Sequence, residues 1–235
     1  MTKVRFGIVL TYECNSSCKW CNRFLDKLPW PDSAMRVDDL YKGWEEVQKL
    51  GWEVIKVRVT GGEPLLHPQF LECMKVIRDK WDTHPTRRVP VFTSIPPSIP
   101  PPKFSWRYKV STHVHQPPMI SPSDLGLEPI YGGGLECKRQ HGCGRLFDAY
   151  GFSFCMFAAP IGRLLHIDPY SPTPVLQGMK EICRHCPWSM GVKSAFHLFK
   201  KVVDGKMEYP TRTYREALER CETDGPLVMA KFGER

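Results

Sequence analysis

The chain of 235 residues has no apolar run of about 18 residues, which is the length that a membrane-spanning helix needs. Its first residues, MTKVRFGIVLTYEC, also lack the pattern of a removable signal peptide. These two absences predict a cytoplasmic protein with no membrane partner. The composition gives no sign of disorder either, because 42% of the residues are hydrophobic and 25% are charged.

Carboxylates are missing from one long stretch, since no aspartate or glutamate occurs between Thr83 and Ser123. The same stretch contains eight basic or histidine residues: His84, Arg87, Arg88, Lys103, Arg107, Lys109, His113 and His115. The formal net charge of the chain is +8. The stretch indicates either a site that favours an anionic group on a small-molecule substrate, or a solvated basic edge strand that resists aggregation.

Cysteine is abundant, with ten residues in the chain, but the absence of an export signal argues against a disulfide scaffold. Seven cysteines fall into two groups with ligand-like spacing, and Cys73, Cys143 and Cys221 remain. Cys73 lies on the apolar face of a predicted helix, where a buried small residue is expected.

The first group consists of Cys14, Cys18 and Cys21, in a C-x3-C-x2-C pattern directly after the strand-like run Val4 to Leu10. Thiols this close in sequence cannot stabilise a fold as disulfides, but they can converge on an iron-sulfur cluster. A four-iron cube held by three thiolates keeps one iron open for a substrate or cosubstrate.

Two segments resemble the radical S-adenosylmethionine (radical SAM) enzymes. The first is the three-cysteine loop, with Trp20 just before the third cysteine. The second is VIKVRVTGGEPLLHP, in which a β-branched run ends in Gly61, Gly62, Glu63 and Pro64, like the GGEP segment of that family. The resemblance implies that Trp20 and these four residues help to bind S-adenosylmethionine.

The resemblance also implies the chemistry. A [4Fe-4S] cluster with an open iron would chelate S-adenosylmethionine and split it reductively into methionine and a 5′-deoxyadenosyl radical, which abstracts a hydrogen atom from the substrate. The electron would come from an external donor such as flavodoxin or ferredoxin. The protein would position the cofactors and exclude water.

The expected fold class is α/β, an abbreviated partial (β/α) TIM-like barrel of the radical SAM type. Apolar periodicity predicts strands over 1–12, 52–60, 89–95 and 104–113, and helices over 31–50, capped by Ser33, and over 68–81. The five prolines between Pro96 and Pro102 exclude a helix there. The resemblance implies that Ser94, Ser111 and His113, near the ends of the last two strands, approach S-adenosylmethionine.

The second group consists of Cys137, Cys155, Cys183 and Cys186. The sequence around Cys155 predicts a hairpin with a turn at Gly151 or Gly162, and the C-x2-C pair is expected at a helix end before Pro187. In an isolated domain, four such cysteines would indicate structural zinc. Behind a radical SAM core they resemble the auxiliary-cluster module called a twitch domain, the short form of the SPASM domain, as in the aminocyclitol radical SAM dehydrogenases. One departure is that only three residues separate Gly151 from Cys155.

We therefore expect a core over 1–130 and, over 131–235, a small module of a β-hairpin and a helix with a second, auxiliary [4Fe-4S] cluster, followed by a tail. Cys143 has three interpretations: a structural thiol, a ligand in place of Cys137, or a catalytic hydrogen-atom donor. In the tail, AFHLFKKVV and KMEYP suggest a pair of strands, and 211–221 a helix.

The leading functional hypothesis is a radical SAM oxidoreductase, resembling a dehydrogenase, with the auxiliary cluster as electron acceptor. The alternatives are a redox-neutral epimerase or isomerase, and a modifying enzyme that acts on a nucleotide, a nucleic acid or a peptide. The contrasting hypothesis is a zinc-binding protein without enzymatic activity.

Overall fold

The computed structural model describes residues 2–18, 20–30, 32–82, 84–98, 100–101, 105–110, 118–130, 137, 144–174 and 180–234. The elements of its first half are β1 (Lys3–Val9), α1 (Val37–Lys49), β2 (Glu53–Thr60), η1 (Pro64–Leu66), α2 (Phe70–Val76), the π-helical turn η2 (Ile77–Trp81), β3 (Val89–Thr93), β4 (Trp106–Val110) and η3 (Pro122–Leu125). Those of its second half are β5 (Arg145–Asp148), β6 (Gly151–Ser153), α4 (Ala158–Leu165), β7 (Tyr170–Ser171), α5 (Lys180–Arg184), η4 (Pro187–Met190), α6 (Val192–Val203) and α7 (Arg212–Asp224).

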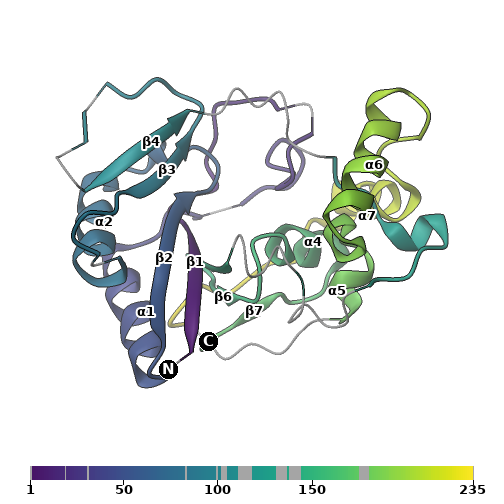
Figure 1. Ribbon diagram of the computed structural model, residues 1–235. Helices are drawn as coiled ribbons and strands as arrows, with labels where there is room; N and C mark the ends of the chain where they lie inside the picture. Colours follow the sequence, from purple (N-terminus) through teal and green to yellow (C-terminus); the bar gives the residue numbers. More distant parts are fainter. Residues whose placement is uncertain are drawn as a thin grey trace.

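The strands form a seven-stranded sheet in the order β4-β3-β2-β1-β5-β6-β7 (Figure 1). The five strands from β4 to β5 are parallel, and β6 and β7 continue the sheet in antiparallel pairs. The protein is therefore α/β with a mostly parallel sheet that is not closed into a barrel. The sheet contains strands from both sides of residue 130, since β5 pairs with β1. The predicted domain boundary between residues 130 and 131 stays a prediction.

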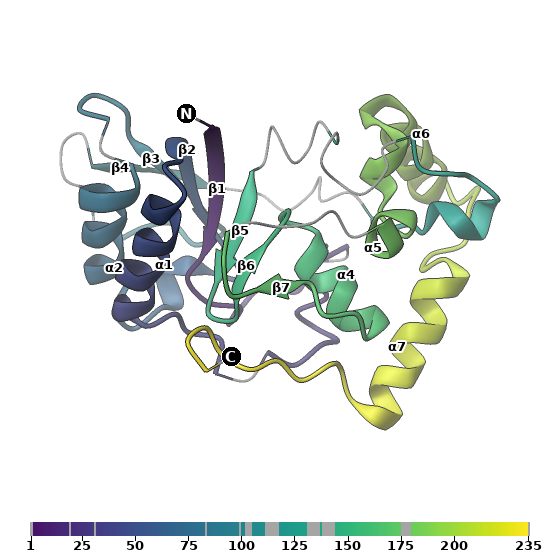
Figure 2. The same ribbon diagram turned by 90° about the horizontal axis from the view of Figure 1, so that it is seen from below.

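Helices α1 and α2 lie at the β1–β4 side of the molecule, and α4 to α7 gather on the other side, beyond β7 (Figures 1 and 2). A core cluster that includes Phe6, Trp81, Phe147 and Phe152 joins the central strands to α1 and α2. After α7, the chain returns toward α1, and Phe232 N–H donates a 2.9 Å hydrogen bond to Ala149 O (Figure 2). None of the helices in the described part of the chain has the length and apolar character that a bilayer crossing needs.

Several predicted elements are confirmed, with shifted ends. The first four strands occur at the expected places, and the hairpin turns just before Gly151. The C-x2-C pair spans the end of α5, with Cys183 in the helix and Cys186 after it, and α7 covers the helix predicted in the tail. The predicted helix over 68–81 is divided, because its last turn is π-helical. Val110, the last residue of β4, is 57% exposed.

Four predictions were wrong. The segment KMEYP, residues 206–210, forms no strand, so the predicted strand pair in the tail does not exist. The segment AFHLFKKVV is helix α6, because Ala195, Leu198, Phe199 and Val202 recur at helical spacing and are buried. Gly162 is not a turn but lies within α4, where a Cβ atom would come within 2.5 Å of Ile167 O. Ser33 does not cap α1, which begins at Val37.

Candidate functional site: two groups of cysteines around the strand ends

The first cysteine group lies in the loop that follows β1. Cys14, Cys18 and Cys21 are half-buried free thiols. The pKa of Cys18 is raised first by burial and then by negative charge on Cys21 and Cys14, so the three sulfur atoms are near enough to interact. Ser16 N–H also donates a 3.4 Å hydrogen bond to Cys14 Sγ. The loop brings the three residues together, as a shared cluster requires.

The GGEP segment is attached to the start of this loop through backbone atoms. Gly62 N–H donates to Thr11 O at 2.9 Å, and Glu63 N–H donates to Glu13 O at 2.7 Å. A Cβ atom on Gly62 would lie 2.2 Å from Glu13 O. The approach of the two chain segments therefore depends on a glycine at position 62.

Glu63 joins the ends of β2 and β3. Its carboxylate is fully buried and accepts four hydrogen bonds, from Thr93 Oγ1, Leu65 N–H, Ser94 N–H and Ser94 Oγ, at 2.7 to 3.1 Å. Because Ser94 Oγ donates to Glu63, Ser16 Oγ must donate the 2.9 Å hydrogen bond that joins it to Ser94 Oγ. Glu63 thus fixes the strand ends around the cysteine loop, and its side chain is enclosed within the protein.

A cavity of about 470 Å³ lies beside Cys14. Its lining comes from two segments, 11–14 and 25–34, and includes Thr11, Glu13, Leu28 and Trp30. Gly61 to Pro64 and Ser94 do not line this cavity. Ser33, the expected helix cap, lies here, and its hydroxyl accepts a 3.0 Å hydrogen bond from Tyr12 N–H.

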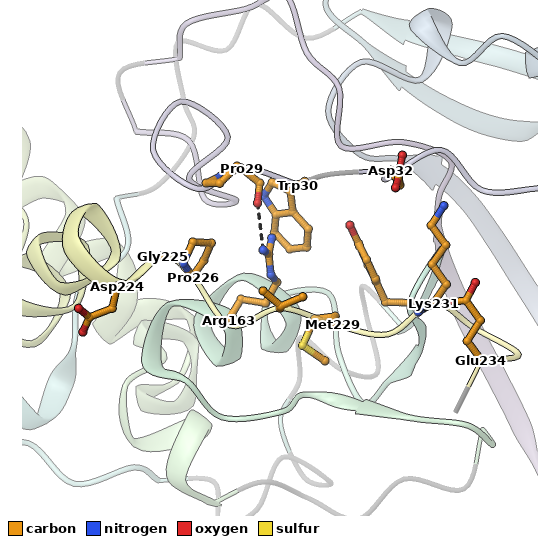
Figure 3. A pocket seen from close by; sticks show the side chains of 12 residues that line it. Pro29, Trp30, Asp32, Arg163, Asp224, Gly225, Pro226, Met229, Lys231 and Glu234 are labelled. Atoms are coloured by element: carbon orange, nitrogen blue, oxygen red, sulfur yellow. Dashed lines mark hydrogen bonds between the residues drawn. The ribbon is translucent and has the colours of Figure 1, made fainter.

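A second cavity, of about 700 Å³, adjoins the first through Pro29, Trp30 and Asp32. Figure 3 shows Arg163 of α4 in its wall, with the guanidinium against the Trp30 ring. Arg163 Cζ lies 4.0 Å from the centre of that ring, and Arg163 Nη2 donates a 2.9 Å hydrogen bond to Pro29 O. The C-terminal segment, including Met229 and Lys231, also lines this cavity (Figure 3).

A buried cluster of one carboxylate and two phenols connects the cysteine loop to the hairpin. Oδ2 of Asp148 accepts hydrogen bonds from Tyr12 OH at 2.6 Å and from Tyr170 OH at 2.7 Å. Burial raises the pKa of Asp148 to about 6, although these hydrogen bonds oppose the change. The Tyr12 ring also has an aromatic neighbour, because Trp30 stacks on it with 3.7 Å between the ring centres.

The second cysteine group comes from distant parts of the chain. Burial raises the pKa of Cys155 to about 12 and that of Cys183 to about 11, and it also raises the pKa of Cys186. Negative charge on Cys137 contributes to all three shifts, so the four sulfur atoms lie in one neighbourhood.

Backbone groups surround the sulfur atoms of this second group. The Phe157 and Ala158 amides donate hydrogen bonds to the sulfur of Cys155, and the Trp188 amide donates to that of Cys186. The thiol of Cys137 donates to Trp188 O at 3.9 Å. Amide donors of this kind stabilise negative charge on sulfur, and they are one of the means by which proteins tune iron-sulfur clusters.

Both donor sets consist of thiols alone, a donor type that iron-sulfur clusters and structural zinc share. A zinc ion with Zn–S bonds of about 2.3 Å would hold its sulfur ligands about 4 Å apart. Within the described residues, no group of three or more His, Cys, Asp or Glu side chains is arranged to hold a metal ion. An iron-sulfur cube, in which each thiolate binds a different iron atom, would take all-sulfur groups such as these.

Of the remaining predicted site residues, some lie within the described residues and some lie outside them. Trp20 is half-buried in the cysteine loop. Ser111, His113 and Cys143 lie outside the described residues. In the carboxylate-free stretch, Arg87 pairs with Asp82 at 2.8 Å, so this arginine has a structural partner just before the stretch.

Sequence reasoning missed the Tyr12–Asp148–Tyr170 cluster and Arg163. The one local signal was an aspartate within the apolar run RLFDAYGF, which a buried hydrogen-bonded role explains. No protein-family model matches this chain, and a comparison with curated proteins finds no significant match either.

Proposed function

We propose that this protein is a radical SAM enzyme with the partial (β/α) barrel of that family. The observation that carries the proposal is the attachment of the three-thiol loop to Gly62 and Glu63 at the carboxyl end of a mostly parallel sheet. Ligand sites of open α/β sheets occur at this end of the strands. Two motifs far apart in the sequence are therefore neighbours at the expected place.

In this proposal, Cys14, Cys18 and Cys21 hold a [4Fe-4S] cluster, and S-adenosylmethionine binds at its open iron. When bound, these cofactors supply the one-electron cleavage of S-adenosylmethionine and the abstraction of a hydrogen atom from the substrate. Backbone N–H groups of Gly62 and Glu63 hold the end of β2 close to the loop. The buried Glu63 keeps Ser94 and Ser16 in fixed positions at the end of β3.

The second cysteine group extends the proposal to a net oxidation. Four thiolates from Cys137, Cys155, Cys183 and Cys186 would close a second [4Fe-4S] cluster against direct ligation of the substrate, so its role would be electron transfer. Amides of Phe157, Ala158 and Trp188 would donate to the ligating sulfurs and so influence the potential. We accordingly propose a dehydrogenase-like reaction on a small molecule, with an external one-electron donor.

The test is anaerobic reconstitution with iron and sulfide. We expect about eight iron atoms per chain, and 5′-deoxyadenosine on addition of dithionite and S-adenosylmethionine. Cys18→Ala should remove about half of the iron and abolish 5′-deoxyadenosine formation. Cys221→Ala, a buried cysteine on α7 outside both groups, is the matched control and should retain both.

Other outcomes would overturn specific parts of the proposal. Zinc without sulfide would refute the cluster assignment and support a zinc-binding protein. Recycling of S-adenosylmethionine, in place of one molecule consumed per product, would refute the net oxidation and support an epimerase or isomerase.

A further inference from the structure

The exposed side of helix α6 combines positive charge with apolar side chains. Phe196 and Val203 are 54% and 58% exposed. Lys193, Lys200 and Lys201 are also exposed. None of these three lysines forms an ion pair with a described residue. These five residues are called the α6 face below; the acidic residue beside them is Asp204, at the end of the helix.

Helical spacing arranges the α6 face in rows. Phe196 and Val203 are seven residues apart, as are Lys193 and Lys200, so each pair lies along one side of the helix and the two rows are adjacent. The opposite side of α6 is buried in the core through Ala195, Leu198, Phe199 and Val202. The fold therefore uses one side of the helix and leaves an apolar row beside a basic row on the other.

An aromatic cluster connects the α6 face to the second cysteine group. The ring centre of Phe196 lies 5.7 Å from that of Trp188 and 5.7 Å from that of Phe199. The backbone of Trp188 contacts two of the cysteines, because its amide donates to the Cys186 sulfur and its carbonyl accepts from the Cys137 thiol. An exposed ring is thus one aromatic contact away from the residue that touches these sulfurs.

We propose that the α6 face docks a small acidic one-electron carrier protein, which takes electrons from the cluster of the second cysteine group. This inference rests on the proposed function and adds the place and the chemistry of a partner. In each encounter the carrier gains one electron and the cluster loses one, and no proton or group is transferred. Opposite charge would steer the carrier, and the apolar row would exclude water from the contact.

Charge complementarity favours an acidic protein, and the aromatic cluster distinguishes such a partner from other polyanions. Nucleic acid or an anionic membrane would also meet the lysines, but neither makes use of a ring that leads to the cysteines. A folded carrier can cover Phe196 and Val203 while its acidic rim pairs with Lys193, Lys200 and Lys201.

The test uses the reconstituted holoprotein and oxidised flavodoxin as the acidic probe, with binding measured by anaerobic calorimetry at 50 and 300 mM salt. The triple variant Lys193→Glu, Lys200→Glu, Lys201→Glu should bind about tenfold more weakly at 50 mM salt, and added salt should weaken the wild type more than the variant. Lys42→Glu, Lys75→Glu, Lys80→Glu is the matched control, because it reverses three exposed lysines around α1 and α2, on the other side of the molecule (Figure 1). It should bind within about twofold of the wild type.

Iron content and circular dichroism must match among the three proteins, which separates lost docking from lost folding. Phe196→Ala, which keeps the charges, should slow electron transfer to flavodoxin more than it weakens binding. Equal binding by the wild type and the α6 variant would overturn the inference. So would equal affinity for cytochrome c, a basic carrier, or α6-dependent binding of single-stranded RNA or anionic vesicles without binding of flavodoxin.

Failure of this inference is distinguishable from failure of the proposed function. If dithionite yields 5′-deoxyadenosine but flavodoxin binds independently of the α6 face, only the docking site is wrong. If dithionite yields none and no cluster forms, the proposed function itself is wrong.

Discussion

The hydroxyl of Tyr12 donates a 2.6 Å hydrogen bond to Oδ2 of Asp148, across 136 positions of the sequence. Tyr12 lies two residues before Cys14, and Asp148 ends β5. Tyr170 donates to the same oxygen at 2.7 Å, and all three side chains are buried. The start of the cysteine loop is therefore held by residues from the second half of the chain.

Asp148→Asn should change the pH dependence of stability. Burial raises the pKa of Asp148 from its ordinary value of 3.8 to about 6. The stability associated with its neutral form is thus complete below pH 3.8 and is lost as the pH rises through 6, which amounts to about 3 kcal/mol. The difference in unfolding free energy between wild type and variant should change by about that amount between pH 4 and pH 7.5 in urea titrations. Glu222→Gln, an exposed substitution on α7, should give a constant difference.

Glu63→Gln should destabilise the protein by about 3 kcal/mol. The amide nitrogen of glutamine would face donors, because both carboxylate oxygens of Glu63 accept two hydrogen bonds each. Urea unfolding at pH 7 measures the loss. Glu72→Gln, at an exposed position of α2, is the control and should change stability by less than about 0.5 kcal/mol. A loss as small as the control's would contradict the role of Glu63 as the link between strand ends.

Gly62→Ala should separate the GGEP segment from the cysteine loop. Its Cβ atom would lie 2.2 Å from Glu13 O and 2.7 Å from Tyr12 O, which are backbone atoms that cannot move independently. We expect a loss of at least about 3 kcal/mol in unfolding free energy and less iron bound after reconstitution.

Gly205→Ala provides the comparison for that variant. Gly205 has a φ of +69° and no atom within 4 Å of an added Cβ atom, so its substitution introduces backbone strain alone. It should cost about 1 kcal/mol and leave the iron content unchanged. Equal effects at the two glycines would show that the close approach at Gly62 is unimportant.

Arg163→Met should release the C-terminal segment. Arg163 is 2% exposed, and its guanidinium donates to Pro29 O and Leu227 O and lies against the Trp30 ring. Methionine fills similar space but cannot make these hydrogen bonds, so we expect a loss of about 2 to 3 kcal/mol and faster proteolytic cleavage within 225–234. Arg220 on α7 donates one hydrogen bond, to Leu164 O, so Arg220→Met should lose less unfolding free energy. Unchanged cleavage would argue against Arg163 as the anchor.

Local patterns predicted the elements whose signals are strong and short in range. Alternating or β-branched runs located the first four strands, and Gly151 located the hairpin. The errors came where tertiary packing decides whether a segment follows the period of a helix or that of a strand. The run AFHLFKKVV is rich in residues that favour strands, but the positions that face the core are spaced three and four apart, so it is a helix. Gly162 suggested a turn, but glycine is needed there for the close contact with Ile167.

By itself, the sequence determined which residues can serve as ligands and where the first group lies, because three thiols within eight residues after a strand must gather at that strand's end. Only the tertiary structure decided the rest: the sheet continues through β5 to β7, Glu63 is enclosed between strand ends, and Asp148 and Arg163 hold the cysteine loop and the chain's end in place. The physical reason is that these contacts join residues from 30 to more than 130 positions apart. Spacing along a chain carries information about neighbours within a turn or a strand, whereas burial and hydrogen-bond partners at such separations depend on how the whole core is packed.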